Sequence, residues 1–279
     1  MKNFINKLII FFILFVIIYK INKSCENFAP VKRKNVLVLY VFHQYNERVK
    51  YFIENNIFED KNVKFMIICN DKYFNIPNYI PSHVTIIKRE NVGYDFGGWS
   101  EGLLKNNNYK NFDYFLFINS SVMGPYLNKD EKRNYVDIYL DGLKNNVKLF
   151  GSTINTIENP IIRSHIQSYI FSTDKEGLEH LINAKIFSLN NHAKTFQNAI
   201  DHKEVKMSRE ILNKGWNIGC LHKYYKDFDF RVDSLKKSKR SVKYASRFGD
   251  VMEKEYEEKL WNKNDLVFVK GNRLNLSKV

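Results

Sequence analysis

Residues 35–41 read Asn-Val-Leu-Val-Leu-Tyr-Val, and every residue after the first is apolar or aromatic. A continuous β-prone run of this length is typical of a strand buried on both faces in a parallel sheet. Similar runs follow at 63–69, 84–88 and 114–118, and the chain between them predicts helices over 47–54 and 98–105. Alternating strands and helices predict an α/β domain with a doubly wound, mostly parallel sheet flanked by helices. The ligand crevice of such a sheet lies beyond the carboxyl ends of its strands.

The second half of the chain has a weaker pattern. It predicts a strand at 147–150, helices at 175–184 and 203–214, and an amphipathic segment at 251–261. We find no internal repeat and no low-complexity linker. A length of 279 residues therefore predicts one large α/β unit with an appendage.

The composition is that of a folded chain with a basic excess. Apolar residues make up 44% and aromatics 15%, and the formal net charge is +14. That charge suits nucleic acid, an anionic membrane or a phosphorylated small substrate. We expect no nucleic-acid partner, because the densest basic run, 236–247, is not interleaved with a series of stacking aromatics. The three cysteines lack the spacing of a zinc site or a disulfide framework.

The N-terminal segment predicts a membrane anchor. Residues 4–21 are apolar or aromatic apart from Asn6, Lys7 and Lys20. At ~1.5 Å per residue they span roughly 27 Å, and the two lysines can reach the headgroups. A cleaved signal peptide is the alternative, but no small-residue cleavage site follows. We therefore expect a single-pass signal anchor at 1–21 and a short stem at 22–34. The membrane would be that of the Golgi or endoplasmic reticulum in a eukaryotic or viral setting, and the cytoplasmic membrane in a bacterium.

A glycine-rich loop, Arg89-Glu-Asn-Val-Gly-Tyr-Asp-Phe-Gly-Gly-Trp99, directly follows the third predicted strand. Its glycines allow tight turns and a close backbone approach, and Arg89, Asn91 and Asp95 supply one cation and two hydrogen-bonding groups. This chemistry suits a nucleotide. The alternative is an ordinary glycine-rich turn with Asp95 as a helix N-cap. The spacing matches neither a P-loop nor a dinucleotide fingerprint.

A second polar cluster, Asn119-Ser120-Ser121, follows the fourth predicted strand. Small amide and hydroxyl side chains at a strand end can hold a diphosphate or a sugar hydroxyl, and Gly124-Pro125 turns the chain away. An Asx or Ser turn is the alternative.

Four motifs in order resemble a group of predicted glycosyltransferases related to the rhamnan-synthesis proteins and, more distantly, to inverting enzymes of the Rossmann-like GT-A fold. They are the loops at 91–99 and 117–125, then His165-Ile-Gln-Ser168 with Thr173-Asp174 and Gly177-Leu178, and finally Glu204, Ser208-Arg209 and Gly215-Trp-Asn-Ile-Gly219. The resemblance covers about residues 35–225 and implies a GT-A-like catalytic domain there. Residues 226–279 are then a basic C-terminal extension packed on or flanking that domain.

The resemblance implies an enzyme that moves a sugar from a nucleotide-sugar donor to a glycan, glycoprotein or glycolipid. The implied donor-binding residues are Asn70, Asp71, Arg89, Asn91, Gly93, Asp95, Asn119, Ser120 and Ser121. GT-A enzymes usually carry a metal-chelating Asp-x-Asp where this chain has Asn119 to Ser121. Neutral side chains are poor ligands for Mn²⁺ or Mg²⁺, so two alternatives stay open. Either no metal cofactor is used and Lys or Arg neutralises the leaving diphosphate, or Mn²⁺ or Mg²⁺ is held by carboxylates elsewhere in the chain.

The resemblance also implies a catalytic base. Glu204 lies eleven residues before Gly215, the separation between the base and the glycine in inverting enzymes. It would take the proton of the acceptor hydroxyl while the diphosphate leaves from the opposite face, with inversion. His165, Gln167 and Trp216 are the implied acceptor or sugar contacts. The alternative for Glu204 is an exposed glutamate at a helix start. The alternative for the whole protein is a non-catalytic carbohydrate- or nucleotide-sugar-binding member of the same fold.

Overall fold

The computed structural model describes residues 35–157, 159–237, 239–252 and 261–273. The predicted anchor and stem, and most of the amphipathic segment predicted at 251–261, lie outside these ranges. Within them, no helix is both long and apolar enough to cross a bilayer. The chain from Asn35 onward falls into one compact unit, and the structure shows no boundary at residue 225.

The strands and helices follow in chain order. The strands are β1 Val36–Phe42, β2 Val63–Cys69, β3 Thr85–Lys88, β4 Tyr114–Asn119, β5 Val122–Met123, β6 Val147–Gly151, β7 Ile154–Asn155, β8 His165–Ile166, β9 Ile170–Asp174, β10 Asn217–Cys220 and β11 Val269–Lys270. The helices are α2 Glu47–Asn56, α3 Tyr94–Leu104, α4 Tyr135–Asp141, α5 Pro160–Arg163, α6 Lys175–Asn183, α7 Phe196–Ala199, α8 Lys206–Asn213, α9 Val232–Lys236, α10 Lys239–Ala245 and α11 Lys263–Leu266. Short 3₁₀ segments are η1 Lys105–Asn111, η3 Lys223–Tyr225 and η4 Gly271–Arg273, and η2 Ile200–Val205 is π-helical.

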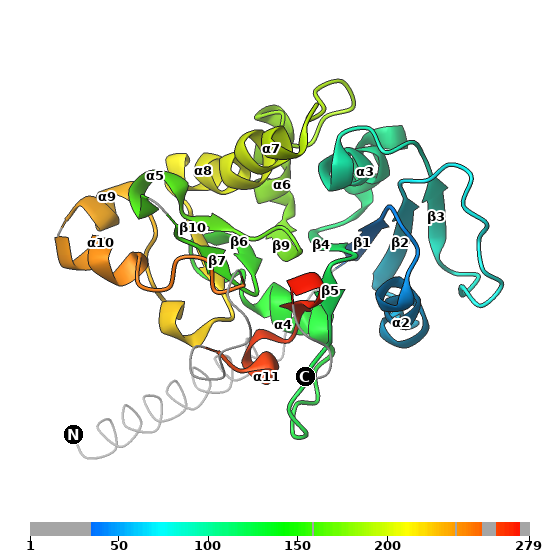
Figure 1. Ribbon diagram of the computed structural model, residues 1–279, viewed down its shortest axis with the longest axis horizontal. Helices are drawn as coiled ribbons and strands as arrows, with labels where there is room; N and C mark the ends of the chain where they lie inside the picture. The colour runs from blue at the N-terminus through cyan, green and yellow to red at the C-terminus, as the bar shows by residue number, and fades with distance from the viewer. Residues whose placement is uncertain (1–34, 158, 238, 253–260, 274–279) are drawn as a thin grey trace, which may run out of the picture. The chain divides into compact units, whose positions relative to one another are not determined.

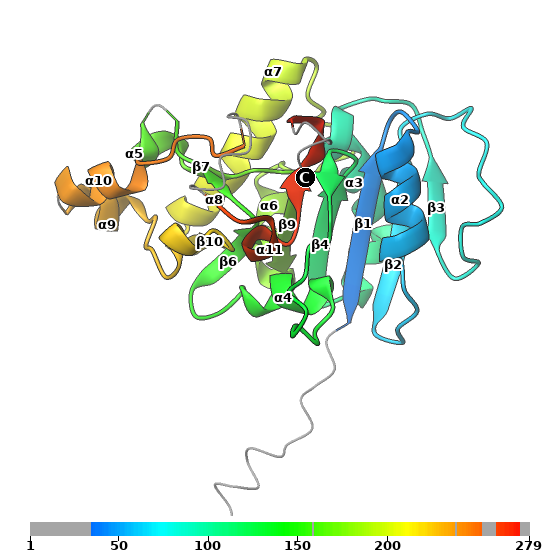
Figure 2. The same ribbon diagram turned by 60° about the horizontal axis from the view of Figure 1, so that its bottom comes forward.

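Seven of the described strands form one sheet in the order β10-β6-β9-β4-β1-β2-β3. The pairs β3–β2, β2–β1, β1–β4 and β6–β10 are parallel, and β9 runs antiparallel between β4 and β6. Figure 2 shows the parallel strands β1 to β4 side by side. The predicted mostly parallel α/β sheet is confirmed, and β9 and β10 are the strands of this sheet that the sequence pattern did not reveal.

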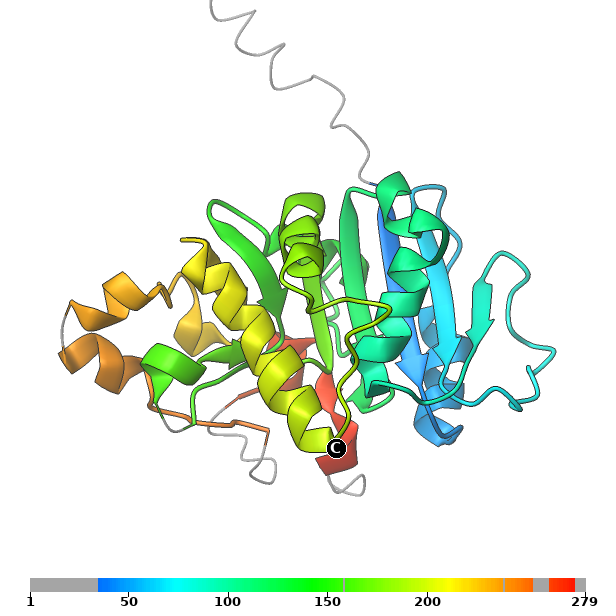
Figure 3. The same ribbon diagram turned by 90° about the horizontal axis from the view of Figure 1, so that it is seen from above.

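Strand β1 shows why both faces of the sheet are covered. All seven of its residues are buried. Val36, Val38 and Tyr40 belong to one apolar cluster, whereas Leu37 and Leu39 belong to the other. Because side chains alternate along a strand, these are the two faces of the sheet. Helices α2 and α4 pack on the first face, and α3, α6 and α8 pack on the second, the face towards the viewer in Figure 3.

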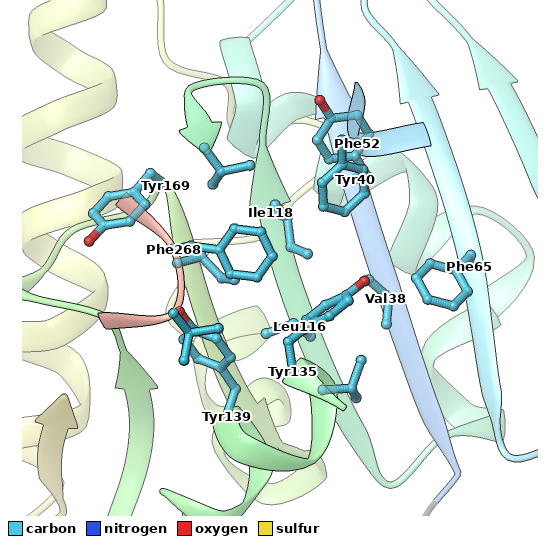
Figure 4. Packing of buried hydrophobic residues seen from close by; sticks show 14 of the residues in the cluster. Val38, Tyr40, Phe52, Phe65, Leu116, Ile118, Tyr135, Tyr139, Tyr169 and Phe268 are labelled. Carbon is cyan, nitrogen blue, oxygen red and sulfur yellow. The ribbon is translucent and has the colours of Figure 1, made fainter. Parts of the chain in front are cut away.

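The C-terminal part of the described chain belongs to the core. Phe268 is fully buried and its ring lies 5.2 Å from that of Tyr135 and 6.3 Å from that of Tyr139, both on α4 (Figure 4). The next residues form β11, which pairs antiparallel with β5. In the other cluster Tyr225, Phe230 and Leu235 are likewise buried. The extension predicted after residue 225 therefore packs into the same unit as the sheet.

The strand order creates a switch point beside β1. From β1 the chain adds β2 and β3 on one side and then returns to add β4 on the other. Neighbouring loops leave such a point in opposite directions and open a crevice at the carboxyl ends of the strands. Here those ends carry His43, which follows β1, and Asn119, the last residue of β4.

Candidate functional site

A cavity of about 570 Å³ lies at this switch point. It brings together side chains from segments far apart in the sequence. The sequence-predicted residues that line it are Asn91, Asp95, Asn119, Ser121, His165, Gln167 and Glu204. A concave site of this size is typical for a small-molecule ligand.

Asn119 joins the end of β4 to the first turn of α3. Its side-chain Nδ2 donates a hydrogen bond to Asp95 Oδ2 at 3.0 Å. Its Oδ1 accepts the backbone N–H of Ser121 at 3.0 Å and the Ser121 hydroxyl. The Asx turn proposed as an alternative is therefore present, and it fixes the position of Asn119 within the cavity wall.

Asp95 is a partly buried carboxyl in the first turn of α3, not the N-cap. The helix starts earlier than predicted, and its N-cap is Gly93, which has a left-handed φ of 78° and no capping side chain. Burial raises the pKa of Asp95 from 3.8 to about 6. The hydrogen bond from Asn119 opposes this shift, the negative charge of Glu204 adds to it, and His43 opposes it. Asp95 therefore changes its protonation near pH 6.

Glu204 lies on the π-helical segment η2, directly before α8. Its Oε1 accepts the backbone N–H of Ser168 at 2.7 Å, which holds the carboxylate against the segment that follows β8. Ser208, one turn later, accepts the backbone N–H of Ile166 at 2.9 Å. Insertions of the π type are frequent at functional sites. The segment from Glu204 to Ser208 thus fixes one wall of the cavity, and Glu204 is not a freely exposed glutamate.

Lys203 anchors the other side of η2. Its buried ammonium donates to three backbone carbonyls, those of Lys185, Ile186 and Asn191, at 2.7, 2.9 and 2.7 Å. These carbonyls belong to the connection between α6 and α7. Since Lys203 precedes Glu204 directly, the same contacts restrict the backbone that carries Glu204.

Two predicted donor-binding residues support the glycine-rich loop from behind. Arg89 is buried and donates to Asn70 Oδ1 at 2.6 Å, to the Val92 carbonyl at 2.7 Å and to Glu101 Oε2 at 2.9 Å. Asn70 in turn donates to the Tyr94 carbonyl at 3.3 Å. Neither side chain lines the cavity. Their hydrogen bonds instead stabilise the conformation of the glycine-rich loop.

Four more predicted residues also lie outside the cavity lining. Gly93 caps α3, Asp71 accepts the backbone N–H of Tyr73 at 2.9 Å, and the Ser120 carbonyl accepts from Arg48 at 3.4 Å. Trp216 directly precedes β10. Strand β10 is parallel to β6, and β9 is antiparallel to both β6 and β4, so β10 runs in the same direction as β4. Trp216 therefore lies at the amino ends of these strands, on the opposite side of the sheet from the carboxyl ends where the cavity lies. There its ring centroid is 5.6 Å from the Lys148 ammonium and 6.0 Å from that of Lys214. Trp216 therefore does not line the cavity with His165 and Gln167, the other two predicted sugar contacts.

The cavity also contains residues that the sequence analysis did not single out. They include His43, Tyr94, Arg163, Phe196, Asp250, Lys270 and Asn272. His43 could have been found, since it directly follows the first predicted strand. Nothing local marks Asp250 or Lys270, which reach the site only through tertiary folding. Gln167 donates to Asp250 Oδ1 at 2.9 Å and accepts the Thr153 hydroxyl at 2.7 Å, so its amide is already engaged.

The cavity wall offers no evident metal site. Across the described ranges, no group of three or more His, Cys, Asp or Glu side chains is arranged to hold a metal ion. Hard cations such as Mg²⁺ favour several oxygen ligands, including carboxylates, and the turn at Asn119 to Ser121 carries only neutral amide, hydroxyl and carbonyl oxygens. The turn therefore lacks the pair of carboxylates with which GT-A enzymes usually hold a divalent ion.

The chain is similar in sequence or in structure to several known proteins. Virulence protein VirA of Vibrio anguillarum is 27% identical over 141 residues, which cover 49% of this chain. The chain thus spans only 41% of the length of that curated relative. Two solved structures align at a TM-score of 0.30, too low to establish a shared fold. One is A197 from STIV, at 9% identity over 52% of this chain and 67% of that one. The other is a glycosyltransferase involved in the glycosylation of the major capsid of PBCV-1, at 17% identity over 59% and 74%.

A family model gives the decisive match. The model of rhamnan synthesis protein F matches residues 66–239. This range includes the glycine-rich loop, the turn after β4 and the segment that carries Glu204, so it spans most of the cavity wall. It is also more than half of the chain, and the chain therefore belongs to the rhamnan synthesis protein F family.

Proposed function

We propose that this protein is a glycosyltransferase that moves a sugar from a nucleotide-sugar donor to a saccharide or glycoconjugate acceptor. One observation carries the proposal: Asp95, Asn119 and Glu204, from three distant segments, line one cavity at the switch point of the sheet. Membership in a family named for the synthesis of a polysaccharide supports the same activity.

The arrangement allows a direct displacement. The acceptor hydroxyl oxygen attacks the anomeric carbon, the bond from that carbon to the diphosphate oxygen breaks, and the nucleoside diphosphate leaves with the electron pair. Glu204 takes the hydroxyl proton, and the sugar inverts its configuration. The hydrogen bond from Ser168 to Glu204 Oε1 orients the carboxylate, which leaves Oε2 for the acceptor. Asn91, Asp95 and the turn at Asn119 contact the donor.

A binding panel followed by an activity assay tests this function. Calorimetry of the purified chain with UDP-, GDP-, dTDP- and CMP-sugars, with and without EDTA, should show binding of one donor class. The Glu204→Gln variant should retain this binding and lose transfer. Absence of heat with every donor, with and without added Mn²⁺ or Mg²⁺, would contradict the proposal. Binding without transfer or donor hydrolysis by the unaltered protein would instead favour a non-catalytic sugar-binding protein.

We also propose that residues 4–21 attach the protein to a membrane, on the strength of their composition. Extraction of the full chain from membranes should require detergent, and release by alkaline carbonate would contradict an anchor.

A further inference from the structure

A basic residue from the C-terminal strand lies beside the turn that follows β4. In the β11–β5 pair, Lys270 stands opposite Val122, and the backbone N–H of Gly271 donates to the Ser121 carbonyl at 2.7 Å. In Figure 1 the red C-terminal strand lies next to β5. Lys270 lines the cavity from this position, next to the turn formed by Asn119 and Ser121.

The position of Lys270 is fixed by its neighbours in the chain. Phe268 and Val269, which precede it, are fully buried in the core. Gly271, which follows it, packs so closely on β5 that an added Cβ would come within 2.2 Å of Met123 Cγ. Both contacts hold β11 against β5, so the cavity-facing lysine is carried on a well-anchored strand.

The charge balance of the cavity leaves a role for this lysine. A departing nucleoside diphosphate is an anion and needs positive charge close to its oxygens. The turn after β4 carries no carboxylate with which to bind a divalent cation, and the rest of the described chain adds no suitable cluster. Two other cations are close to this site. Arg163 lines the cavity from the end of α5, where its guanidinium donates to Asp201 Oδ1 at 3.1 Å. Arg48 donates to the Ser120 carbonyl at 3.4 Å but does not line the cavity. Lys270 combines the two features, because it lines the cavity and its strand pairs with β5 directly after the turn.

Building on the proposed function, we propose that Lys270 is the counter-charge for the diphosphate of the nucleotide-sugar donor, and that diphosphate binding needs no divalent cation. The ammonium takes the place that a metal ion holds in enzymes with an Asp-x-Asp. It stabilises the charge that develops on the diphosphate oxygen as the bond to the sugar breaks.

Calorimetry on the full chain with UDP, GDP and dTDP, each compared with its monophosphate, tests this role. The unaltered protein should bind its diphosphate equally well with EDTA and with added Mn²⁺. Lys270→Met should weaken diphosphate binding roughly 10–100-fold and monophosphate binding much less, because the second phosphate meets the ammonium. Lys270→Arg should retain most of the diphosphate affinity. Lys263→Met, which removes a lysine on α11, seven residues earlier in the chain and outside the cavity lining, is the matched control and should bind as the unaltered protein does.

The outcomes separate this inference from the proposed function. Diphosphate binding that disappears in EDTA, or that is unchanged in Lys270→Met, overturns the role of Lys270 and leaves the glycosyltransferase standing. Lack of binding of any nucleotide by the unaltered protein, with and without Mn²⁺, removes both. Thermal melting of each variant shows whether it is folded. If Lys270→Met does not fold, the other two measurements decide. Diphosphate binding that is equal with EDTA and with Mn²⁺, and that Lys270→Arg largely retains, supports the proposal, and failure of either result overturns it.

Discussion

The side-chain amide of Asn119 donates to the carboxylate of Asp95 across 3.0 Å and so joins the carboxyl end of β4 to the first turn of α3. The two residues are 24 positions apart, and each belongs to one of the polar loops that the sequence analysis selected. Their contact turns two separate loops into one wall of the cavity. The predictions below test this wall and the elements that support it.

The protonation of Asp95 should make stability depend on pH. The pKa of the Asp95 carboxyl has its ordinary value of 3.8 in the unfolded chain and is raised to about 6 in the folded protein. Between these values the folded state holds a proton that the unfolded state has lost, so the free energy of unfolding falls as pH rises through this window. The Asp95→Asn variant keeps an acceptor for Asn119 and should lose this slope. Urea denaturation of both proteins from pH 4 to pH 7 measures it. The same pH dependence of the free energy of unfolding in both proteins would show that Asp95 does not cause this slope.

Replacing Glu204 by Gln should separate catalysis from binding. The amide oxygen can still accept the Ser168 N–H, so the wall of the cavity is kept, but the side chain can no longer take a proton. We expect transfer to slow by roughly 10²–10⁴-fold, the usual contribution of a general base, with donor affinity nearly unchanged. Glu176→Gln, on the exposed side of α6, serves as the control and should leave transfer intact. Full activity of Glu204→Gln would rule out its role as the base.

Lys203→Met should disturb the protein through the loop between α6 and α7. The substitution removes the donor from three backbone carbonyls, of which the Ile186 carbonyl is buried and the other two are partly buried. Each unpaired buried group costs roughly 1–3 kcal/mol. We expect a loss of unfolding free energy of at least this size. The rate of transfer should also fall more than donor affinity, because the backbone beside Glu204 is released. Denaturant titration and steady-state kinetics check both effects, and a stability equal to that of the unaltered protein would contradict the role.

Gly97→Ala should be strongly destabilising for a steric reason. A Cβ at this position would lie 2.0 Å from the Val92 carbonyl oxygen, which Arg89 already holds by a hydrogen bond. We expect a cost of roughly 3 kcal/mol or more. Gly215→Ala is the comparison, because a Cβ there meets nothing within 4 Å and only the positive φ of 85° opposes it. It should cost roughly 1–2 kcal/mol. A melting temperature for Gly97→Ala as high as that of Gly215→Ala would contradict the extra cost of the clash.

Trp216→Ala should leave the affinity for donor unchanged. The ring lies between Lys148 and Lys214 at the far edge of the sheet, so its loss removes cation–π contacts worth roughly 0.5–1 kcal/mol each at exposed sites. The variant should therefore melt earlier and bind the nucleotide sugar as before. A clear drop in the affinity for the nucleotide sugar, measured by calorimetry, would show that Trp216 contributes to donor binding.

The sequence by itself determined the central sheet. Four apolar runs became β1, β2, β3 and β4. Strands β1, β2 and β4 are mostly buried, as continuous β-prone runs in a parallel sheet usually are, whereas β3 is the partly exposed edge strand. The same reasoning identified the polar residues at the strand ends, and Asp95 and Asn119 do meet there. Local patterns carry this information because strand and helix periodicity is a property of neighbouring residues.

Only the tertiary structure decided which of these polar residues reach the cavity. Asn70 and Arg89 carry the same local signal as Asp95, yet their hydrogen bonds to each other and to the loop backbone turn them away from it. Lys270 carries no local signal, and the pairing of β11 with β5 brings it to the site from more than 140 residues away along the chain. Contacts between distant segments follow from how the whole chain packs its apolar faces, and that packing is not encoded in any short window of sequence.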